Sequence, residues 1–424
     1  MKTILHLCIL TIMATLFSLT SSFAGGLWLY EQATPDMGRS AAGRAAAALD
    51  ASTAGHNAAG MTKLDRSQIM TGFQGIIARV KFDKNAATTT PGGNGGDAGS
   101  FIPVTAFYYV HSVSDDLKLG LSVGSFFGLG LDYQDGWAGR YYNEDAELMS
   151  AAILPSVGYR LNDWLSVGAG VSMLYGKLTQ NVAINNLLQR SDGRLRISEN
   201  DIAYGFTLSM LVEPRDGTRF GLQYASEHDL EFDDSFDLIN AGLLYNLILG
   251  KSGIKKGSKA GIELTVPQQL MFSIYHEINN RLAIMANFGW QDYSSFGEST
   301  LTLSGNINRS LSLDRDMHDV FHYALGLRCR LKEKWIVSTG IAYDTSPASN
   351  SKRTPDLPLD KQVRLSAGLE YEMNDDITIG GAYTYLDAGT ARIKQNGGRL
   401  RGNLHGNYDK NVLHIFSINL SWKF

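Results

Sequence analysis

Two groups of residues have the spacing that enzymes use for hydrolysis or for metal binding. The stretch GLSVG, from Gly120 to Gly124, matches the pattern of a nucleophilic serine between two glycines. That pattern requires a sharp turn from a strand into a helix, whereas the alternation around it predicts an uninterrupted strand. His318 and His322 have the spacing of metal ligands on a helix, but a strand separates residues at this spacing by about 13 Å. We therefore expect no catalytic residues, no metal site, no cofactor and no enzyme activity.

The first residues of the chain predict export. Lys2 precedes a mostly apolar stretch from Ile4 to Leu19, and Ser22-Phe23-Ala24 has the small-x-small pattern of a cleavage site. We expect residues 1–24 to be a signal peptide; the alternative is a membrane anchor, for which the apolar stretch is short. Cleavage leaves Cys329 as the only cysteine, which excludes an intramolecular disulfide.

The composition favours strands and excludes a nucleic-acid partner. The formal net charge of −4 is mild and acidic, whereas nucleic-acid-binding domains carry a basic face. The 45 glycines, 19 tyrosines and 18 phenylalanines, against only 9 prolines, suit many strands joined by tight turns. Beyond the first 24 residues, no apolar run is long enough for a membrane helix.

Apolar and polar residues alternate in one segment after another. From Phe416 to Phe424, apolar residues occupy every second position and polar residues lie between them. This period of two is typical of a strand with one apolar and one polar face. We expect fourteen strands, at residues 67–82, 101–113, 117–132, 146–161, 164–177, 202–213, 218–232, 261–278, 281–296, 317–331, 335–345, 361–373, 377–387 and 410–424.

The connections between these segments alternate strictly between short and long. Outer-membrane barrels have this arrangement, with short periplasmic turns, long external loops, an apolar exterior and a polar lumen. An even number of strands also closes the sheet without exposed edges. Residues 67–424 therefore predict an all-β fold, a transmembrane antiparallel β-barrel in the outer membrane of a Gram-negative bacterium. The alternative is a secreted soluble β protein.

Residues 25–66 precede the first expected strand and have no strand period. They are rich in alanine, with glycine at intervals from Gly43 onward. A barrel of this size has a lumen that water fills unless something blocks it. We expect this segment to be a hatch inside the lumen, with Arg39, Arg44, Asp50, His56 and Asn57 bonded to the polar wall; the alternative is a flexible periplasmic tail.

Two of the long loops contain apolar residues at helix-like spacing. The first spans residues 178–201 and the second residues 233–260, which include Leu243 and Leu247. The cations Arg190, Lys251 and Lys255 follow these apolar stretches. Loops that face water do not expose this much apolar surface unless it contacts something. Either the loops pack against each other, or they form an external groove with cations at its rim, suited to an amphipathic anion. The cations equally suit the phosphates of lipopolysaccharide.

The third expected strand is unusually rich in glycine, at Gly124, Gly128 and Gly130. Glycine inside a strand often marks a bulge or a bend. A break in pairing at this point opens the barrel wall. The alternative reading is that the glycines provide room for the hatch.

The segment from Leu27 to Asn57 resembles the hatch of the long-chain fatty acid transporter family (FadL/TodX). The stretches FFGLGLDY, ending at Tyr133, and YDTSP, starting at Tyr343, also resemble that family. The hatch of the family usually continues from asparagine to proline, whereas Ala58 follows Asn57 here. The residues that carry the hatch resemblance are Glu31, Gly38, Arg39, Gly43, Asp50 and Asn57.

The resemblance implies a monomeric barrel that imports hydrophobic compounds without an energy source of its own. It implies an outer capture groove from the two loop helices, a lumen pocket that Leu27 enters, and lateral exit at a kink near Gly128. The expected substrates are long-chain fatty acids. The alternatives are an importer of aromatic hydrocarbons in the same family and a general diffusion porin, which would lack a plug.

Overall fold

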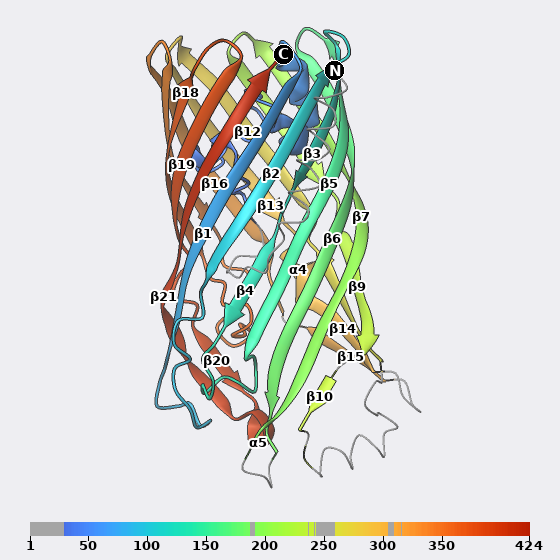
Figure 1. The fold of residues 1–424 in the computed structure, drawn as a ribbon, viewed down its shortest axis with the longest axis vertical. Helices are drawn as coiled ribbons and strands as arrows, with labels where there is room; N and C mark the ends of the chain where they lie inside the picture. Colours follow the sequence, from blue (N-terminus) through green and yellow to red (C-terminus); the bar gives the residue numbers. More distant parts are fainter. Residues whose placement is uncertain are drawn as a thin grey trace.

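The computed structural model describes residues 29–186, 191–235, 237–240, 242, 259–303, 309–314 and 316–424. In this part of the chain, the alternating segments form a closed, 14-stranded antiparallel β-barrel, which confirms the predicted fold (Figure 1). Each strand pairs with its neighbours along the chain, and the last strand pairs with the first, where Ile69 lies opposite Trp422. No helix among the described residues is long and apolar enough to cross a membrane.

The barrel strands follow one another in sequence order. They are β1 (Gln68–Lys84), β2 (Phe101–Ser112), β3 (Leu117–Gly124) with β4 (Gly128–Asp132), β5 (Asp145–Asn162), β6 (Leu165–Ile184), β7 (Gly193–Arg215), β8 (Thr218–Ala225), β12 (Gln269–Asn279), β13 (Leu282–Gln291), β16 (Val320–Lys332), β17 (Trp335–Asp344), β18 (Gln362–Glu372), β19 (Ile377–Asp387) and β21 (Asn403–Lys423).

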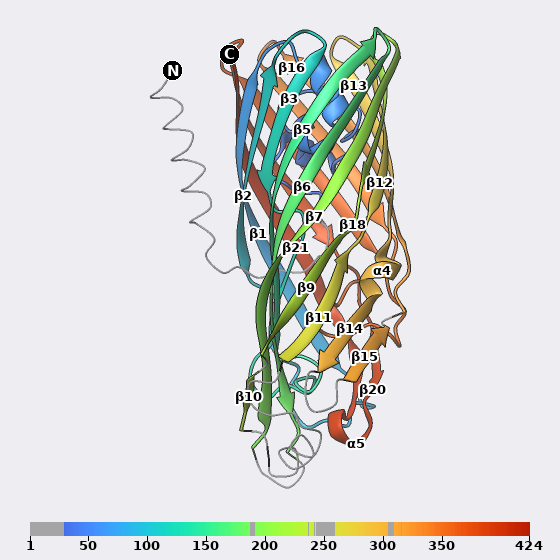
Figure 2. The same ribbon diagram turned by 90° about the vertical axis from the view of Figure 1, so that its right-hand side faces the viewer.

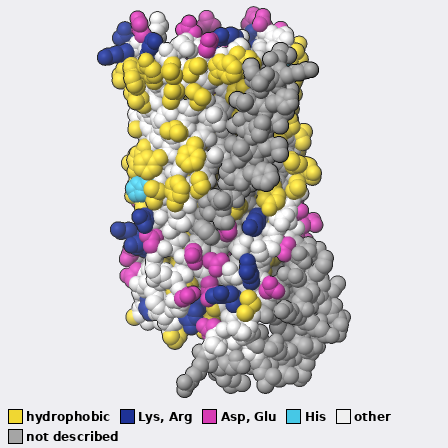
Figure 3. Space-filling model, viewed as in Figure 1, with side chains coloured by type: hydrophobic (Ala, Val, Ile, Leu, Met, Phe, Trp, Pro, Cys, Tyr) yellow, Lys and Arg dark blue, Asp and Glu magenta, His cyan; other side chains and the backbone are white. Residues whose placement is uncertain are grey.

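The two faces of the wall differ in polarity as the alternation predicts. On β21, Phe416 and Ile418 are 51% and 63% exposed, whereas Ser417 and Asn419 between them are buried. On the face shown in Figure 3, apolar side chains gather in a band across the barrel, and charged side chains lie beyond this band at both ends. A wall that is apolar outside and polar inside is stable when lipid surrounds it.

Some expected strands are interrupted. Residues 218–232 divide into β8 and β9 (His228–Ser235), and residues 261–278 divide into β11 (Lys259–Val266) and β12. Pro267, which lacks an N–H for the ladder, lies at the second division. Beyond the divisions, β9 and β11 form a second, four-stranded sheet with β14 (Glu298–Leu303) and β15 (Arg309–Asp314). The expected strand 281–296 ends at Gln291, and α4 (Tyr293–Gly297) follows.

The helix expected after the fifth strand is wrong for the described residues. Strands β6 and β7 stay paired until Ile184 lies opposite Gly193. Pairing with β7 satisfies backbone groups of these residues, and so it overrides the helix-like spacing. The second loop is described only near its ends, where β10 (Asp237–Ile239) pairs with β7. Another loop holds β20 (Ile393–Asn396) and α5 (Gly398–Arg401).

Residues 29–67, which we call the N-terminal segment, lie inside the barrel near the end that holds the C-terminus (Figures 1 and 2). This segment contains three short helices, η1 (Pro35–Arg39), α2 (Thr53–His56) and η2 (Ala58–Lys63), and most of its residues are buried. Glycines of the wall provide the room. A Cβ at Gly221 would lie 1.8 Å from the Ala45 oxygen, and one at Gly340 would lie 2.2 Å from the Arg39 oxygen.

Candidate functional site

The middle of the N-terminal segment is hydrogen-bonded to the barrel wall. The Gly43 N–H donates to Oδ1 of Asn287 at 2.8 Å, and Nδ2 of Asn287 donates to the Ala41 oxygen at 2.7 Å. Gly43 has a φ of +76°, a conformation that favours glycine. Nδ2 of Asn57 donates to the Met210 oxygen of β7 at 3.0 Å. These bonds fix the segment to two strands of the wall, β13 and β7.

Arg39 and Asp50 bond within the segment itself. Nε of Arg39 donates to the Ala42 oxygen at 2.8 Å, and Oδ1 of Asp50 accepts from the Ser52 N–H at 2.9 Å. Asn57 is extended, with φ −166° and ψ 98°, and the residue after it, Ala58, begins η2. The first position of a helix tolerates proline because its N–H has no partner there. The turn is therefore formed with Ala58 in place of the usual proline.

A charged pair is buried inside the segment. Nε of Arg44 lies 2.7 Å from Oδ2 of Asp36, and both side chains are almost completely buried. Burial opposes ionisation of Asp36, but Arg44, His56 and Arg39 outweigh it and hold its pKa below the ordinary value. Burial, with the nearby Arg44 charge, lowers the pKa of His56 to about 3, although Asp36 opposes this. At neutral pH, Arg44 and Asp36 are thus charged and His56 is neutral.

The start of the segment is held by a second charged cluster. Nε of Arg364 on β18 lies 3.0 Å from Oε1 of Glu31. The same guanidinium bonds to Asp344 on β17, and Oδ1 of Asp344 is 2.5 Å from Nδ1 of His322. The ring of Tyr30 stacks on the His322 ring, with centroids 4.1 Å apart. All of these groups are buried, so the cluster joins the segment to three wall strands.

The wall is interrupted next to this start. Residues 125–127 separate β3 from β4, and β5 pairs with both pieces. On the other side, the ladder between β2 and β3 ends where Phe107 lies opposite Val123, and no pairing joins β2 to β4 among the described residues. The Leu29 N–H donates to the Phe126 oxygen at 3.0 Å. The first described residue of the segment is therefore bonded to the interruption.

The glycines of the third strand lie at this interruption. Gly124 ends β3, Gly128 begins β4 and Gly130 lies within β4. A Cβ at Gly124 would meet only Ala106, at 3.6 Å, and one at Gly128 would meet only the Leu148 oxygen, also at 3.6 Å. The surroundings of these two glycines are open, in contrast to the crowded wall glycines that face the hatch.

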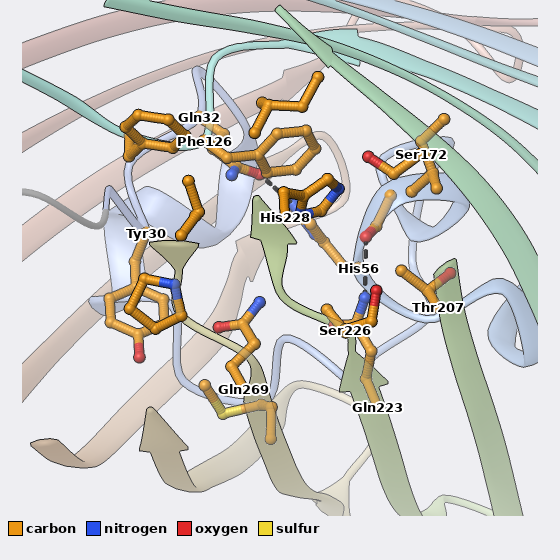
Figure 4. Close-up of a pocket in the computed structure, with 18 of the residues that line it drawn as sticks. Tyr30, Gln32, His56, Phe126, Ser172, Thr207, Gln223, Ser226, His228 and Gln269 are labelled. Carbon is orange, nitrogen blue, oxygen red and sulfur yellow. Dashed lines mark hydrogen bonds between the residues drawn. The ribbon is translucent and has the colours of Figure 1, made fainter. Parts of the chain in front are cut away.

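A cavity of about 710 Å³, including its open mouth, lies between the N-terminal segment and the wall. The residues lining it come from the segment, the β3–β4 interruption, the inner wall and the β8–β9 and β11–β12 divisions (Figure 4). They are Tyr30, Gln32, Arg44, Gly55, His56, Phe126, Phe127, Leu154, Ser172, Leu174, Thr207, Gln223, Ala225, Ser226, His228, Val266, Pro267, Gln269 and Met271.

Few of the residues singled out in the sequence line the cavity; Arg44 and His56 of the N-terminal segment do. The expected ligand-binding residues Leu27, Arg190, Leu243, Leu247, Lys251 and Lys255 lie outside the described residues. The hatch residues Arg39, Gly43, Asp50 and Asn57 and the glycines at 124, 128 and 130 are absent from the lining. Pro267 is the one signal in the sequence that could have indicated the divided strands on the far side of the cavity.

Two described cations near the long loops, Arg194 and Arg140, are paired. Nε of Arg194 lies 2.6 Å from Oε2 of Glu144, and Nε of Arg140 lies 2.7 Å from Oδ2 of Asp192. The loops also contain a core of their own, in which Trp137 is buried and stacks on Tyr133 with centroids 3.9 Å apart. Among the described residues, no group of three or more His, Cys, Asp or Glu side chains could hold a metal ion.

Known proteins resemble this chain over nearly its whole length. A family model described as outer membrane protein transport protein (OMPP1/FadL/TodX) matches residues 15–424. A long-chain fatty acid transport protein of Escherichia coli is 26% identical, with 94% of each chain covered. Outer membrane protein P1 of Haemophilus influenzae is 24% identical, with 97% of this chain and 98% of that protein covered.

Solved structures share the fold. A FadL homologue from Pseudomonas aeruginosa has a TM-score of 0.85 at 21% identity and covers 95% of this chain and 100% of its own. The toluene transporter TodX of P. putida has a TM-score of 0.66 at 14% identity and covers 88% of this chain and 94% of its own. At these identities, the likeness establishes the barrel and its closure.

Proposed function

We propose that this chain, which belongs to the outer membrane protein transport family (OMPP1/FadL/TodX), is a passive channel for hydrophobic compounds, most of all long-chain fatty acids. Members of the family transport hydrophobic compounds across the Gram-negative outer membrane, and the barrel lies in that membrane. The proposal includes the absence of enzyme activity. Ser122, the serine of GLSVG, is buried within β3 and not at a strand-to-helix turn.

The cavity between the N-terminal segment and the interrupted wall is the observation that supports this function. Its apolar side chains, such as Leu154, Leu174 and Met271, can take up a hydrocarbon. Burial of each CH2 group contributes about 0.8 kcal/mol. Phe126 and Phe127 belong both to the cavity lining and to the β3–β4 interruption. A compound in the cavity is therefore next to the place where the wall lacks a pairing.

The proposed path has three steps. An external groove of the long loops captures the compound, the lumen cavity receives it, and the gap between β2 and β4 releases it sideways into the membrane. The start of the N-terminal segment controls release, since Leu29 is bonded to Phe126. Leu27 is proposed to enter the cavity, and Leu243, Leu247, Arg190, Lys251 and Lys255 to form the groove. The remaining N-terminal segment acts as the plug, and the barrel works as a monomer.

Uptake of labelled oleate, with labelled toluene in parallel, tests this function. The host cells lack their own fatty acid channel and express the protein at matched levels. Gly128→Ile should lower uptake at least about tenfold, equivalent to a barrier increase of about 1.4 kcal/mol, because the side chain fills the gap. Gly381→Ile is the matched control, because a Cβ at Gly381 also meets a single carbonyl oxygen at 3.6 Å, on the intact wall.

The outcomes separate the proposed function from its alternatives. Equal uptake by the wild type and both variants would show that the lateral exit is wrong. Uptake of toluene without oleate would favour the aromatic hydrocarbon importer. Large conductance of small ions by the purified barrel in planar bilayers would favour a general diffusion porin, since the hatch should block ions.

A further inference from the structure

The cavity that we propose for transport contains many polar groups but little charge. Of the described residues that line it, Arg44 is the only Asp, Glu, Lys or Arg. The other polar lining groups are amides, hydroxyls and imidazoles, including Gln32, His56, Ser172 and Gln269. Figure 4 shows these side chains around one space, with contributions from the N-terminal segment and from several strands.

The charge of Arg44 is already compensated. Its Nε is 2.7 Å from Oδ2 of Asp36, and its Nη2 donates to the backbone oxygen of Tyr30. Asp36 is 2% exposed, so the pair is withdrawn from water. A buried cation that is paired and hydrogen-bonded gives little to a second anion, whereas a carboxylate that enters the cavity loses its hydration.

Several neutral polar side chains of the lining have no hydrogen-bond partner among the described residues. Nε2 of His228 is buried and has no hydrogen-bond partner among the described residues. No hydrogen bond is formed by the side chains of Ser172 or Gln269 to other described residues. A buried polar atom without a partner carries a free-energy cost, which a ligand that donates or accepts a hydrogen bond removes. A neutral imidazole, a hydroxyl and an amide can each serve such a ligand.

We infer that the lumen cavity selects an uncharged, hydrogen-bonding amphiphile, such as a long-chain alcohol or a protonated fatty acid, over the carboxylate anion. This inference rests on the proposed function and specifies the substrate class of the same cavity. The apolar lining holds the chain, and the unpartnered neutral groups hold the head. A pure hydrocarbon leaves those groups without a partner, and an anion finds no free cation. A fatty acid therefore passes the cavity in its neutral form.

Calorimetric titration of the purified full-length barrel in detergent tests the inference. The probes are octan-1-ol and octanoate at pH 8, where the carboxylate is ionised. The wild type should bind octan-1-ol at least about tenfold more tightly, a difference of about 1.4 kcal/mol. Gln269→Lys should reverse this preference by at least as much because it places an unpaired cation in the lining. Gln269→Met, in which the new side chain has a similar length and no charge, should still bind octanoate weakly.

The results distinguish failure of the inference from failure of the proposed function. The inference is overturned if octanoate binds the wild type as tightly as octan-1-ol does, or if Gln269→Lys leaves the preference unchanged. In either case the probes still bind in the cavity, so the proposed function is not affected. Ser172→Phe fills the cavity and should weaken both probes at least about tenfold. Absence of binding by either probe, or binding that Ser172→Phe leaves intact, overturns both, because the lumen cavity is then not the binding place.

Discussion

The barrel wall is interrupted at two places that face the same cavity, and the interruptions differ in what covers them. At the first, β4 pairs with β5, and residues 101–106 of β2 have no strand partner on that side among the described residues. At the second, β9 pairs with β11 as β8 pairs with β12, so this hairpin bends as a unit. There β9 lies against the inner face of the wall, where a Cβ at Gly176 would lie 2.5 Å from Cδ1 of the buried Leu230.

A break in a strand is therefore not in itself an opening. The β8–β9 division is filled by packed side chains, including Leu230 and Phe232, both of which are 0% exposed. Among the described residues, the start of the N-terminal segment and residues 125–127 lie behind the β3–β4 interruption, where the Leu29 N–H donates to the Phe126 oxygen. An exit needs a part of the wall that few contacts hold, since closely packed regions do not move without a large free-energy cost.

The largest effect is expected from removing the charged cluster behind the first interruption. Arg364→Ala leaves the buried carboxylates of Glu31 and Asp344 without their cation and should lower the free energy of unfolding by about 3–5 kcal/mol. Guanidinium unfolding in detergent measures this change. Hydrogen exchange should rise at residues 29–34, while β9 keeps its protection. The comparison fails if both places lose protection equally.

Arg330→Ala is the matched control for that variant. Arg330 is also a wall arginine paired with a carboxylate, Glu372, but both side chains are about one third exposed. Exposed pairs contribute about 0–1 kcal/mol. A loss for Arg364→Ala that is no larger than the loss for Arg330→Ala would show that the cluster does not hold the start of the segment.

An intermediate effect is expected from pH, through His56 in the cavity lining between the two interruptions. The pKa of His56 is lowered to about 3 from the ordinary value of 6.5. Below pH 6.5 the unfolded chain binds a proton that the folded protein does not bind, so stability falls as the pH decreases toward 3. The slope is about 1.4 kcal/mol per pH unit, or about 2 kcal/mol between pH 6.5 and pH 5.

His56→Gln should remove this contribution to the pH dependence. The measurement is the unfolding free energy of the variant and of the wild type at several pH values from 7 to 5, and the difference between the two proteins should change by about 2 kcal/mol over that range. His111→Gln, on the exposed outer face of β2, should leave the contribution in place. Asp36, whose pKa is lowered, contributes stability that is lost only below its unfolded value near pH 4, and so it does not interfere. An unchanged slope in His56→Gln would mean that another group causes the pH dependence.

The sequence predicts the barrel well and the cavity poorly, for physical reasons. The alternation from Phe416 to Phe424 reflects the two faces of one strand. It can be read from a short stretch of sequence without knowledge of the neighbouring strands. The cavity joins Tyr30, Ser172 and His228, which lie far apart in the chain and meet only when the barrel closes. The pairing of β6 with β7 up to Ile184 likewise depends on a neighbour that local spacing does not reveal.

The smallest expected effect compares alanine at the two interruptions directly. Gly176→Ala should lower the free energy of unfolding by about 1–3 kcal/mol, because the new methyl group overpacks against Leu230. Gly128→Ala should change it by no more than about 0.5 kcal/mol, since a Cβ there meets only one oxygen at 3.6 Å. Guanidinium unfolding of both variants measures the difference. Equal losses of unfolding free energy in the two variants would mean that the two interruptions are equally packed. The packing would then give no reason to propose the β3–β4 interruption as the exit.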